Sequence, residues 1–215
     1  MSRLRYDPHE GASYLAASSS AFGALVARVG PPSLRRMPAP SLFFALARAI
    51  TSQQLSGKAA ATIFGRVEAK LLATTHRAFS PEALAALPDV ALREAGLSHA
   101  KLLALRDLAA HCADGRLPTL RGCARLPDAE LVERLTAVRG VGRWTVEMLL
   151  IFRLGRKDVW PVHDLGVQEG ARRTFGLTAR PTPKELTKLG DPLAPFRSLG
   201  AWYLWRATEL PPGPV

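Results

Sequence analysis

The sequence has few of the residues that build metal clusters or disulfide frameworks. Its 215 residues include only 2 cysteines, Cys112 and Cys123, and two thiolates cannot complete a four-thiolate zinc or iron–sulfur site. The N-terminus lacks the charged, apolar and cleavage regions of a secretory signal, which argues against an oxidising compartment and a disulfide. We therefore interpret both cysteines as packing residues of a cytoplasmic protein.

Long apolar runs and strand-like alternation are also missing. No apolar run approaches the roughly 20 residues that a membrane-spanning helix needs, so we expect no membrane partner. Apolar and polar residues do not alternate in a convincing set of strands. Helix caps and helical apolar stripes recur instead, and they predict an all-α fold with residues 1–215 forming one globular unit.

Acidic residues are scarce relative to basic ones. The chain has 29 Lys and Arg against 18 Asp and Glu, which gives a net charge of +11. The plain alternative is a basic surface that only keeps the protein in solution, but such a charge in a folded chain favours a polyanion as partner. No long block of Lys or Arg occurs, so the charge belongs to the fold rather than to a tail.

Serine, threonine and aspartate stand where helices are expected to begin, and glycine where they end. The predicted starts are Ser41, Ser56, Ser80, Asp89, Ser98, Asp128 and Thr182, and the predicted stops are Gly96, Gly115 and Gly140. The helix that begins near Ser41 should break near residues 54–57, which places Gln53 and Gln54 at a helix end or in the connecting turn. The proline-rich residues 31–40 form a connector.

Residues 130–154 predict a helix, a tight turn and a second helix. Gly140 and Gly142 allow a positive φ and the close approach of another backbone. The second helix should begin at about Gly142, and its unpaired N–H groups suit a phosphate oxygen. A helical corner with a glycine stop is the ordinary alternative, while Arg139 and Arg143 on either side favour nucleic acid.

The stretch VRGVGRWTVEMLLIFRLGRKDVWPVHDLGV, residues 138–167, resembles the helix-hairpin-helix, loop and aspartate of the DNA base-excision glycosylases. It is most similar to the DNA-3-methyladenine glycosylase II (AlkA-like) group. Further matches are ITSQQLS (50–56), GLSHAKLLALRDLA (96–109) and PFRSLGAWYLWR (195–206). The resemblance implies two helical subdomains flanking a cleft. A central subdomain would cover 41–160 and include the hairpin at about 130–154, and a terminal one would cover 1–40 plus 161–215.

The resemblance also implies an activity. It makes Asp164 the catalytic carboxylate of a monofunctional glycosylase that flips alkylated purines of the 3-methyladenine type out of duplex DNA and leaves an abasic site. By local chemistry alone Asp164 is a helix N-cap, and the two roles are compatible. Relatives that also cleave the strand carry a lysine where Trp144 stands, so we expect no lyase activity. His163 is assigned no catalysis and is expected to contact DNA or a backbone carbonyl.

Other roles are carried over position by position. The candidates for the base pocket are Trp144, Met148, Trp202 and Trp205, although aromatic residues at helical spacing are more often core. The candidates for DNA contact are Gln53, Gln54, Lys101, Arg139, Gly140, Val141, Gly142 and Arg143, with Arg197 weaker. The carbonyls of Thr136, Val138 and Val141 match a monovalent cation site (Na or K).

No cofactor is required in this interpretation, and duplex DNA is the partner of a nucleoid-associated monomer. Three alternatives stay open: a helix-hairpin-helix protein that binds DNA without catalysis, a glycosylase with another base preference, and a helical scaffold for protein interactions, which would show no salt-dependent DNA affinity. Surface salt bridges would explain any single basic residue equally well.

Overall fold

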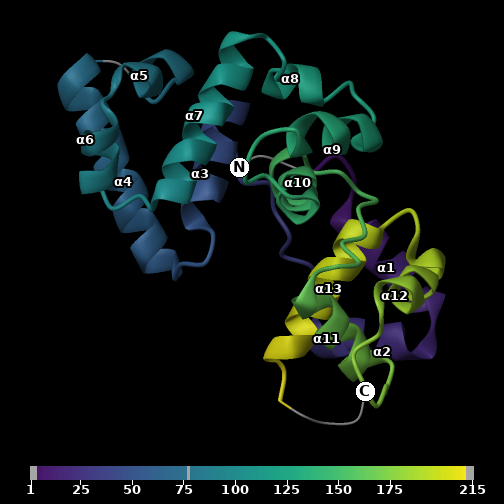
Figure 1. Cartoon of the computed structure of the whole chain (residues 1–215). Helices are drawn as coiled ribbons and strands as arrows, with labels where there is room; N and C mark the ends of the chain where they lie inside the picture. The colour runs from purple at the N-terminus through teal and green to yellow at the C-terminus, as the bar shows by residue number, and fades with distance from the viewer. Residues whose placement is uncertain (1–3, 77, 212–215) are drawn as a thin grey trace. The chain divides into compact units, whose positions relative to one another are not determined.

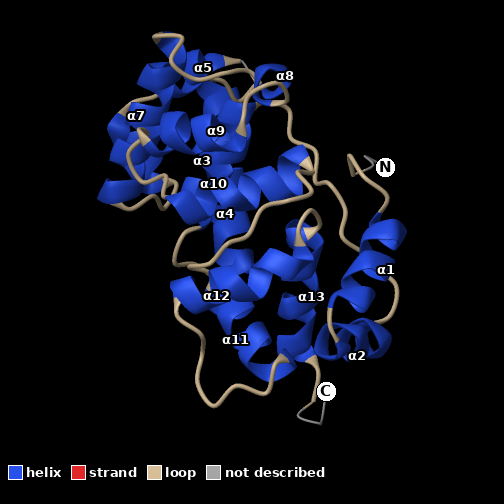
Figure 2. Cartoon of the chain, turned by 90° about the vertical axis from the view of Figure 1, so that its right-hand side faces the viewer, coloured by secondary structure: helices blue, strands red, loops and turns tan. Residues whose placement is uncertain are grey.

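The computed structural model describes residues 4–76 and 78–211. Within these ranges every regular element is a helix and no strand occurs (Figure 2), which confirms the predicted all-α fold. The chain forms two compact units. Unit 1 combines Met1–Pro38 with Glu147–Val215, and unit 2 is Ala39–Val146. Unit 2 ends earlier in the chain than the central subdomain expected to reach residue 160, and the division into subdomains stays a prediction.

Unit 2 is built around α3 and α7, which pack against each other (Figure 1). Phe43 and Phe44 of α3 join Phe64 and Phe79 in an aromatic cluster whose ring centroids lie 5.0–5.6 Å apart. This cluster and the leucines of α7 anchor the unit. Its helices are α3 (Leu42–Ser52), α4 (Gly57–Thr75), α5 (Pro81–Ala86), α6 (Asp89–Glu94), α7 (His99–Ala113), α8 (Leu120–Cys123) and α9 (Asp128–Thr136).

Unit 1 is organised by α13, which packs against α11, α2 and α1. Tyr203 of α13 is fully buried, and its hydroxyl donates to the Gly30 carbonyl at 3.1 Å. The helices are α1 (Pro8–Ser18), α2 (Ser20–Val29), the π-helical η1 (Leu150–Leu154), α11 (Leu165–Thr174), α12 (Pro183–Gly190), the 3₁₀ turn η2 (Asp191–Leu193) and α13 (Arg197–Glu209). Helix α10 (Arg143–Leu149) begins in unit 2 and ends in unit 1.

The predicted helix starts are mostly confirmed. Side-chain oxygens of Ser41, Ser56, Ser80, Ser98 and Thr182 accept the capping amides of α3, α4, α5, α7 and α12. Asp89 and Asp128 are different, because each is the first residue inside its helix and a proline occupies the cap position. The prediction of Asp89 as a cap is therefore wrong. Its carboxylate instead pairs with Arg106 at 2.6 Å.

The predicted stops hold where glycine follows the last turn. Gly96 and Gly115 have positive φ values just after α6 and α7. The helix expected to run to Gly140 ends earlier, at Thr136, because the chain turns to bury Val138 and Val141. Residues 31–40 form no helix, as expected of a connector. Over the described residues, no helix is both long enough and apolar enough to cross a lipid bilayer.

Candidate active site

The predicted hairpin is present, and buried valines fix its turn in unit 2. Val138 and Val141 are only 1% and 4% exposed. The Val138 amide donates to the Leu135 carbonyl at 3.2 Å, and the Val141 amide donates to the Val138 carbonyl at 3.0 Å. The turn between α9 and α10 is therefore held by its own backbone and two apolar anchors. Arg139, Gly142, Arg143 and Trp144 remain on the exposed side.

The two hairpin glycines have different reasons to be glycine. Gly140 has φ +77°, and a Cβ there would lie 3.1 Å from Ala104 Cβ on α7. Gly142 lacks a positive φ, and no atom lies within 4 Å of the place its Cβ would occupy. Of the two glycines that allow a positive φ, only Gly140 adopts one. At Gly142 the missing side chain leaves open space beside an exposed backbone.

Polar side chains brace the hairpin and the α3–α4 turn from within unit 2. Asp107 Oδ2 accepts the Arg139 amide at 2.7 Å, and Gln53 Nε2 donates to the Gly140 carbonyl at 2.8 Å. The Lys101 ammonium donates to the carbonyls of Thr51 and Gln53, each at 2.7 Å. Burial lowers the pKa of Lys101 from its ordinary value. These bonds favour a bracing role for Gln53 and Lys101, whose contact with DNA stays a prediction.

Gln54 lies at the exposed tip of the α3–α4 turn. Its φ of +57° is left-handed, a conformation that costs a non-glycine residue on the order of 1–3 kcal/mol. The neighbouring Leu55 side chain is also exposed. The strained turn thus presents Gln54 to solvent, and the DNA contact expected of it stays a prediction.

Asp164 is the N-cap of α11 in unit 1 and is only 8% exposed. Its Oδ1 accepts the Val167 amide at 2.8 Å and the Trp205 indole N–H at 2.9 Å. Its own amide donates to the Pro161 carbonyl at 3.0 Å. Gln168 Nε2 holds the Val162 carbonyl of the same loop at 2.9 Å. The carboxylate is therefore fixed at both its backbone and one of its oxygens, whereas the adjacent His163 is exposed.

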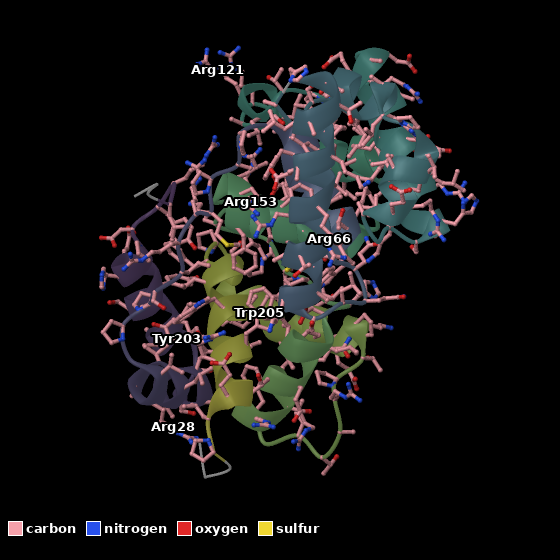
Figure 3. The ribbon with its side chains drawn as sticks, turned by 90° about the vertical axis from the view of Figure 1, so that its left-hand side faces the viewer. Arg28, Arg66, Arg121, Arg153, Tyr203 and Trp205 are labelled. Atoms are coloured by element: carbon pink, nitrogen blue, oxygen red, sulfur yellow. The ribbon has the colours of Figure 1, made fainter. Side chains whose placement is uncertain are left out.

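Trp205 links Asp164 to the π-helical segment. Its ring stacks on Phe152 of η1, with centroids 5.6 Å apart and planes inclined by 23°. The Phe152 carbonyl in turn accepts the Met37 amide at 2.7 Å. Figure 3 labels Trp205 on α13, drawn in yellow. One polar edge and one face of the indole are thus engaged, and α13 is brought to the cap of α11.

The other predicted pocket residues have distinct surroundings. Trp144 belongs to unit 2 and is 49% exposed, while Met148 is half-buried in unit 1. Trp202 is 7% exposed, packs against Tyr203 with centroids 4.9 Å apart, and has the Arg206 guanidinium 5.7 Å from its ring centroid. Of the predicted aromatic residues, Trp205 contacts Asp164 directly. The pocket role of all four residues stays a prediction.

Charged candidates outside the hairpin are engaged in protein contacts. Arg197 forms a two-pronged ion pair with Asp158, at 2.6 and 2.7 Å, and this pair raises the pKa of the guanidinium. Over the described ranges no three His, Cys, Asp or Glu side chains are grouped closely enough to hold a metal ion. The expected cation site consists of backbone carbonyls and is a different kind of site.

Sequence reasoning missed three residues of these two sites. Asp107 braces the hairpin, Phe152 supports Trp205, and Gly166 lies against the Asp164–Trp205 pair. Asp107 lies in the quoted stretch 96–109, but nothing local marks a carboxylate on a helix as an acceptor for a distant amide. Gly166 was visible as a glycine in the first turn of a helix, where glycine is unfavourable without a packing reason.

Comparison with known proteins places the chain in one family. Residues 47–195 match the model of the HhH-GPD superfamily of base excision DNA repair proteins. DNA-3-methyladenine glycosylase 1 of Schizosaccharomyces pombe is 41% identical over 165 residues, which cover 77% of this chain and 72% of that protein. The alkylbase DNA glycosidase-like protein mag2 of the same organism is 32% identical over 197 residues, which cover 92% of this chain and 92% of that protein.

Solved structures agree. The Schizosaccharomyces pombe 3-methyladenine DNA glycosylase Mag1, solved in complex with abasic DNA, superposes with a TM-score of 0.82 at 36% identity, covering 96% of this chain and 100% of that one. A DNA-3-methyladenine glycosidase from Bacillus halodurans gives the same TM-score at 35% identity, covering 95% of this chain and 90% of that one. The chain therefore belongs to the HhH-GPD superfamily of base excision DNA repair proteins.

Proposed function

We propose that this protein is a DNA glycosylase that hydrolyses the N-glycosidic bond of alkylated purines, of the 3-methyladenine type, in duplex DNA. The observation that carries the proposal is the buried Asp164 carboxylate, held through Oδ1 by the Val167 amide and the Trp205 indole. Family membership and relatives named as 3-methyladenine glycosylases support the substrate class. The net charge of +11 suits duplex DNA as the partner.

The proposed chemistry needs one carboxylate. As the bond between C1′ and the base nitrogen breaks, its electron pair leaves with the base and the sugar becomes oxocarbenium-like. A fixed anion beside C1′ stabilises that charge and orients the water that attacks it. An alkylated purine is already cationic, so it departs as a neutral base without strong acid catalysis. Asp164 would serve as this anion.

The hairpin would supply the grip on DNA. The exposed backbone at Gly142 can approach a phosphate because no side chain intervenes, and Arg139 and Arg143 add positive charge beside it. A flipped nucleotide costs a few kcal/mol of stacking. Gln54, at the strained and exposed tip of its turn, would fill the gap that the base leaves. Trp144 stands where a Schiff-base lysine would be needed, so the proposed enzyme leaves an abasic site without cutting the strand.

The proposed monovalent cation would be bound by backbone carbonyls of the hairpin. Neutral oxygens of Thr136, Val138 and Val141 suit Na⁺ or K⁺ better than a transition metal. The Val138 carbonyl already accepts the Val141 amide at 3.0 Å and retains a second lone pair. The ion would add positive charge near the phosphate. Replacing K⁺ by choline at constant ionic strength should weaken duplex binding, and unchanged affinity would argue against the site.

The test of function is release of free base. The protein is incubated with duplex DNA that carries 3-methyladenine, 7-methylguanine, hypoxanthine or uracil, and the released bases are separated. We expect methylated purines to be released and Asp164→Asn to lower their kcat by roughly 100-fold to 1,000-fold, as for loss of one transition-state stabiliser. Lesion-DNA affinity should persist. Binding without any release would favour the non-enzymatic alternative, and release of uracil alone would change the substrate class.

A further inference from the structure

Gly166 lies directly against the hydrogen bond between Trp205 and Asp164. A Cβ at this position would lie 2.8 Å from Trp205 Cδ1, 3.1 Å from Trp205 Nε1 and 3.1 Å from Asp164 Oδ1. Real Cβ atoms essentially never approach another heavy atom within 3.0 Å. Any side chain here would therefore displace the indole, the carboxylate or both.

The next turn of α11 explains how α13 comes so close. A Cβ at Gly170 would lie 2.0 Å from the Leu204 carbonyl oxygen, so the two helix backbones are in direct contact there. Residues four apart share a helix face. Gly166 and Gly170 thus form one smooth face of α11 on which Leu204 and Trp205 of α13 rest.

The far end of the α11–α13 contact is fastened separately. Arg173 donates to the Thr208 carbonyl at 3.0 Å and pairs with Glu169 at 3.0 Å. This fastening belongs to the last turns of both helices and does not involve the indole. The far end of the contact therefore has hydrogen bonds of its own, separate from those of the Asp164–Trp205 pair.

Phe152 restrains the indole on its face. Stacking at 5.6 Å keeps the ring plane fixed, so the direction of the N–H bond is set by the ring rather than by solvent. With the ring held by Phe152 and no side chain at position 166, the N–H meets Oδ1 at 2.9 Å. The Val167 amide donates to the same oxygen at 2.8 Å. Two donors on one oxygen leave the carboxylate a single orientation.

We propose that Gly166 is a positioning residue: its lack of a side chain lets the Trp205 indole orient the Asp164 carboxylate for the reaction. This inference rests on the proposed role of Asp164 and adds the residue that allows its carboxylate to be oriented. Misplacing a reacting group by about 1 Å can cost on the order of 100-fold in rate. A methyl group at position 166 should therefore lower kcat, while KM stays nearly unchanged because the DNA-gripping residues are untouched.

The test compares Gly166→Ala with Gly190→Ala. Gly190→Ala creates the same kind of steric clash with a tryptophan in the same unit. A Cβ at position 190 would lie 2.3 Å from Trp160 Nε1, and the Trp160 N–H donates to the Leu186 carbonyl at 2.8 Å. We expect Gly166→Ala to lower kcat by about 10-fold to 100-fold, with KM within about 2-fold of the wild type. Per folded molecule, Gly190→Ala should keep the kcat of the wild type.

The chemical shifts of the indole N–H groups distinguish a change in the Asp164–Trp205 hydrogen bond from a general loss of stability. The chain has 4 tryptophans, and Asp164→Asn identifies the Trp205 signal in a ¹⁵N–¹H spectrum by shifting it. Gly166→Ala should shift that same signal and leave the Trp160 signal in place, whereas Gly190→Ala should do the reverse. A shifted Trp205 signal with unchanged kcat would overturn the positioning role.

A second variant covers the case in which Gly166→Ala does not fold. Trp205→Phe keeps a ring on Phe152 but removes the N–H donor, and we expect about a 10-fold loss of kcat with little change in KM. An unchanged kcat in this variant would overturn the proposal by itself. Failure of the proposed function gives a different result: either the wild type releases no base, or Asp164→Asn releases base as fast as the wild type.

Discussion

The hairpin of unit 2 and the Asp164 site of unit 1 are built in opposite ways. At the hairpin the proposed DNA-binding surface is the exposed backbone around Gly142, with exposed arginines beside it, and the buried residues only hold the turn. At the other site the proposed catalytic group is one side chain, Asp164, which is 8% exposed and is held by the Val167 amide and the Trp205 indole.

This difference follows from what each site has to do. A phosphate grip tolerates small shifts, since a charge-based contact changes gradually with distance and is screened by salt. A carboxylate that stabilises a developing positive charge must be aimed before the reaction starts. The hairpin should therefore respond to substitution in binding and stability, and the Asp164 site in rate.

The largest expected effect is a difference in stability between alanine variants of the two hairpin glycines. Gly140→Ala should reduce the free energy of unfolding by about 1–3 kcal/mol, because φ is +77° and Ala104 Cβ would lie 3.1 Å from the new methyl. Gly142→Ala meets no atom within 4 Å and should stay within about 0.5 kcal/mol of the wild type. Urea unfolding of both variants measures this contrast.

In DNA affinity, Gly142→Ala rather than Gly140→Ala should be the variant that differs more from the wild type. Gly142→Ala places a methyl where a phosphate would approach, and we expect affinity for duplex DNA to fall by roughly 10-fold, or about 1.4 kcal/mol. If Gly142→Ala binds duplex DNA as well as the wild type, the backbone at this position is not the phosphate contact.

An intermediate effect tests whether Lys101 braces the protein or contacts DNA. Lys101→Met removes two bonds from an ammonium to the Thr51 and Gln53 carbonyls and should cost about 0.5–1.5 kcal/mol in unfolding free energy, because the side chain is partly exposed. The slope of DNA affinity against salt should not change. Arg139→Gln is the matched control, and it should lower that slope by about 1 with little loss of stability. A lower slope for Lys101→Met would instead mean that its ammonium neutralises a phosphate.

The same contrast explains what the sequence predicted and what it could not. Helix starts at Ser56, Ser80, Ser98 and Thr182 depend on bonds within one turn, so local patterns were enough. The hairpin and the Asp164 N-cap were predicted because each belongs to a contiguous motif. The Trp205 partner of Asp164 was not, because its indole is 41 residues away and reaches Asp164 only through the packing of α11 on α13.

Two further misses have the same origin. The π-helical turn at Leu150–Leu154 leaves no signature in apolar periodicity, yet it presents Phe152 to Trp205. The sequence allows a positive φ at both Gly140 and Gly142, and only the contact of Gly140 with α7 shows which of the two adopts it. Long-range packing, rather than local propensity, decided each of these cases.

The smallest effect concerns the end of the α11–α13 contact that is remote from Asp164. Bonds from Arg172 and Arg173 lower the pKa of Glu169 from its ordinary value of 4.5 to about 2. A lowered pKa in the folded state stabilises the fold above pH 4.5, and this contribution is lost as the pH falls through about 2. Because these side chains are partly exposed, Glu169→Gln should cost less than about 1 kcal/mol at pH 7.

Two measurements test Glu169→Gln: its unfolding free energy as a function of pH, and its rate of base release. The difference in unfolding free energy between Glu169→Gln and the wild type should be constant above pH 4.5 and shrink toward pH 2. Glu209→Gln, which breaks a pair with Arg206 within α13, is the control for removing one surface charge. Base release per folded molecule should not change in either variant. A loss of kcat in Glu169→Gln would show that the two ends of the α11–α13 contact are coupled. The stability of unit 1 and the orientation of the Asp164 carboxylate would then depend on the same contacts.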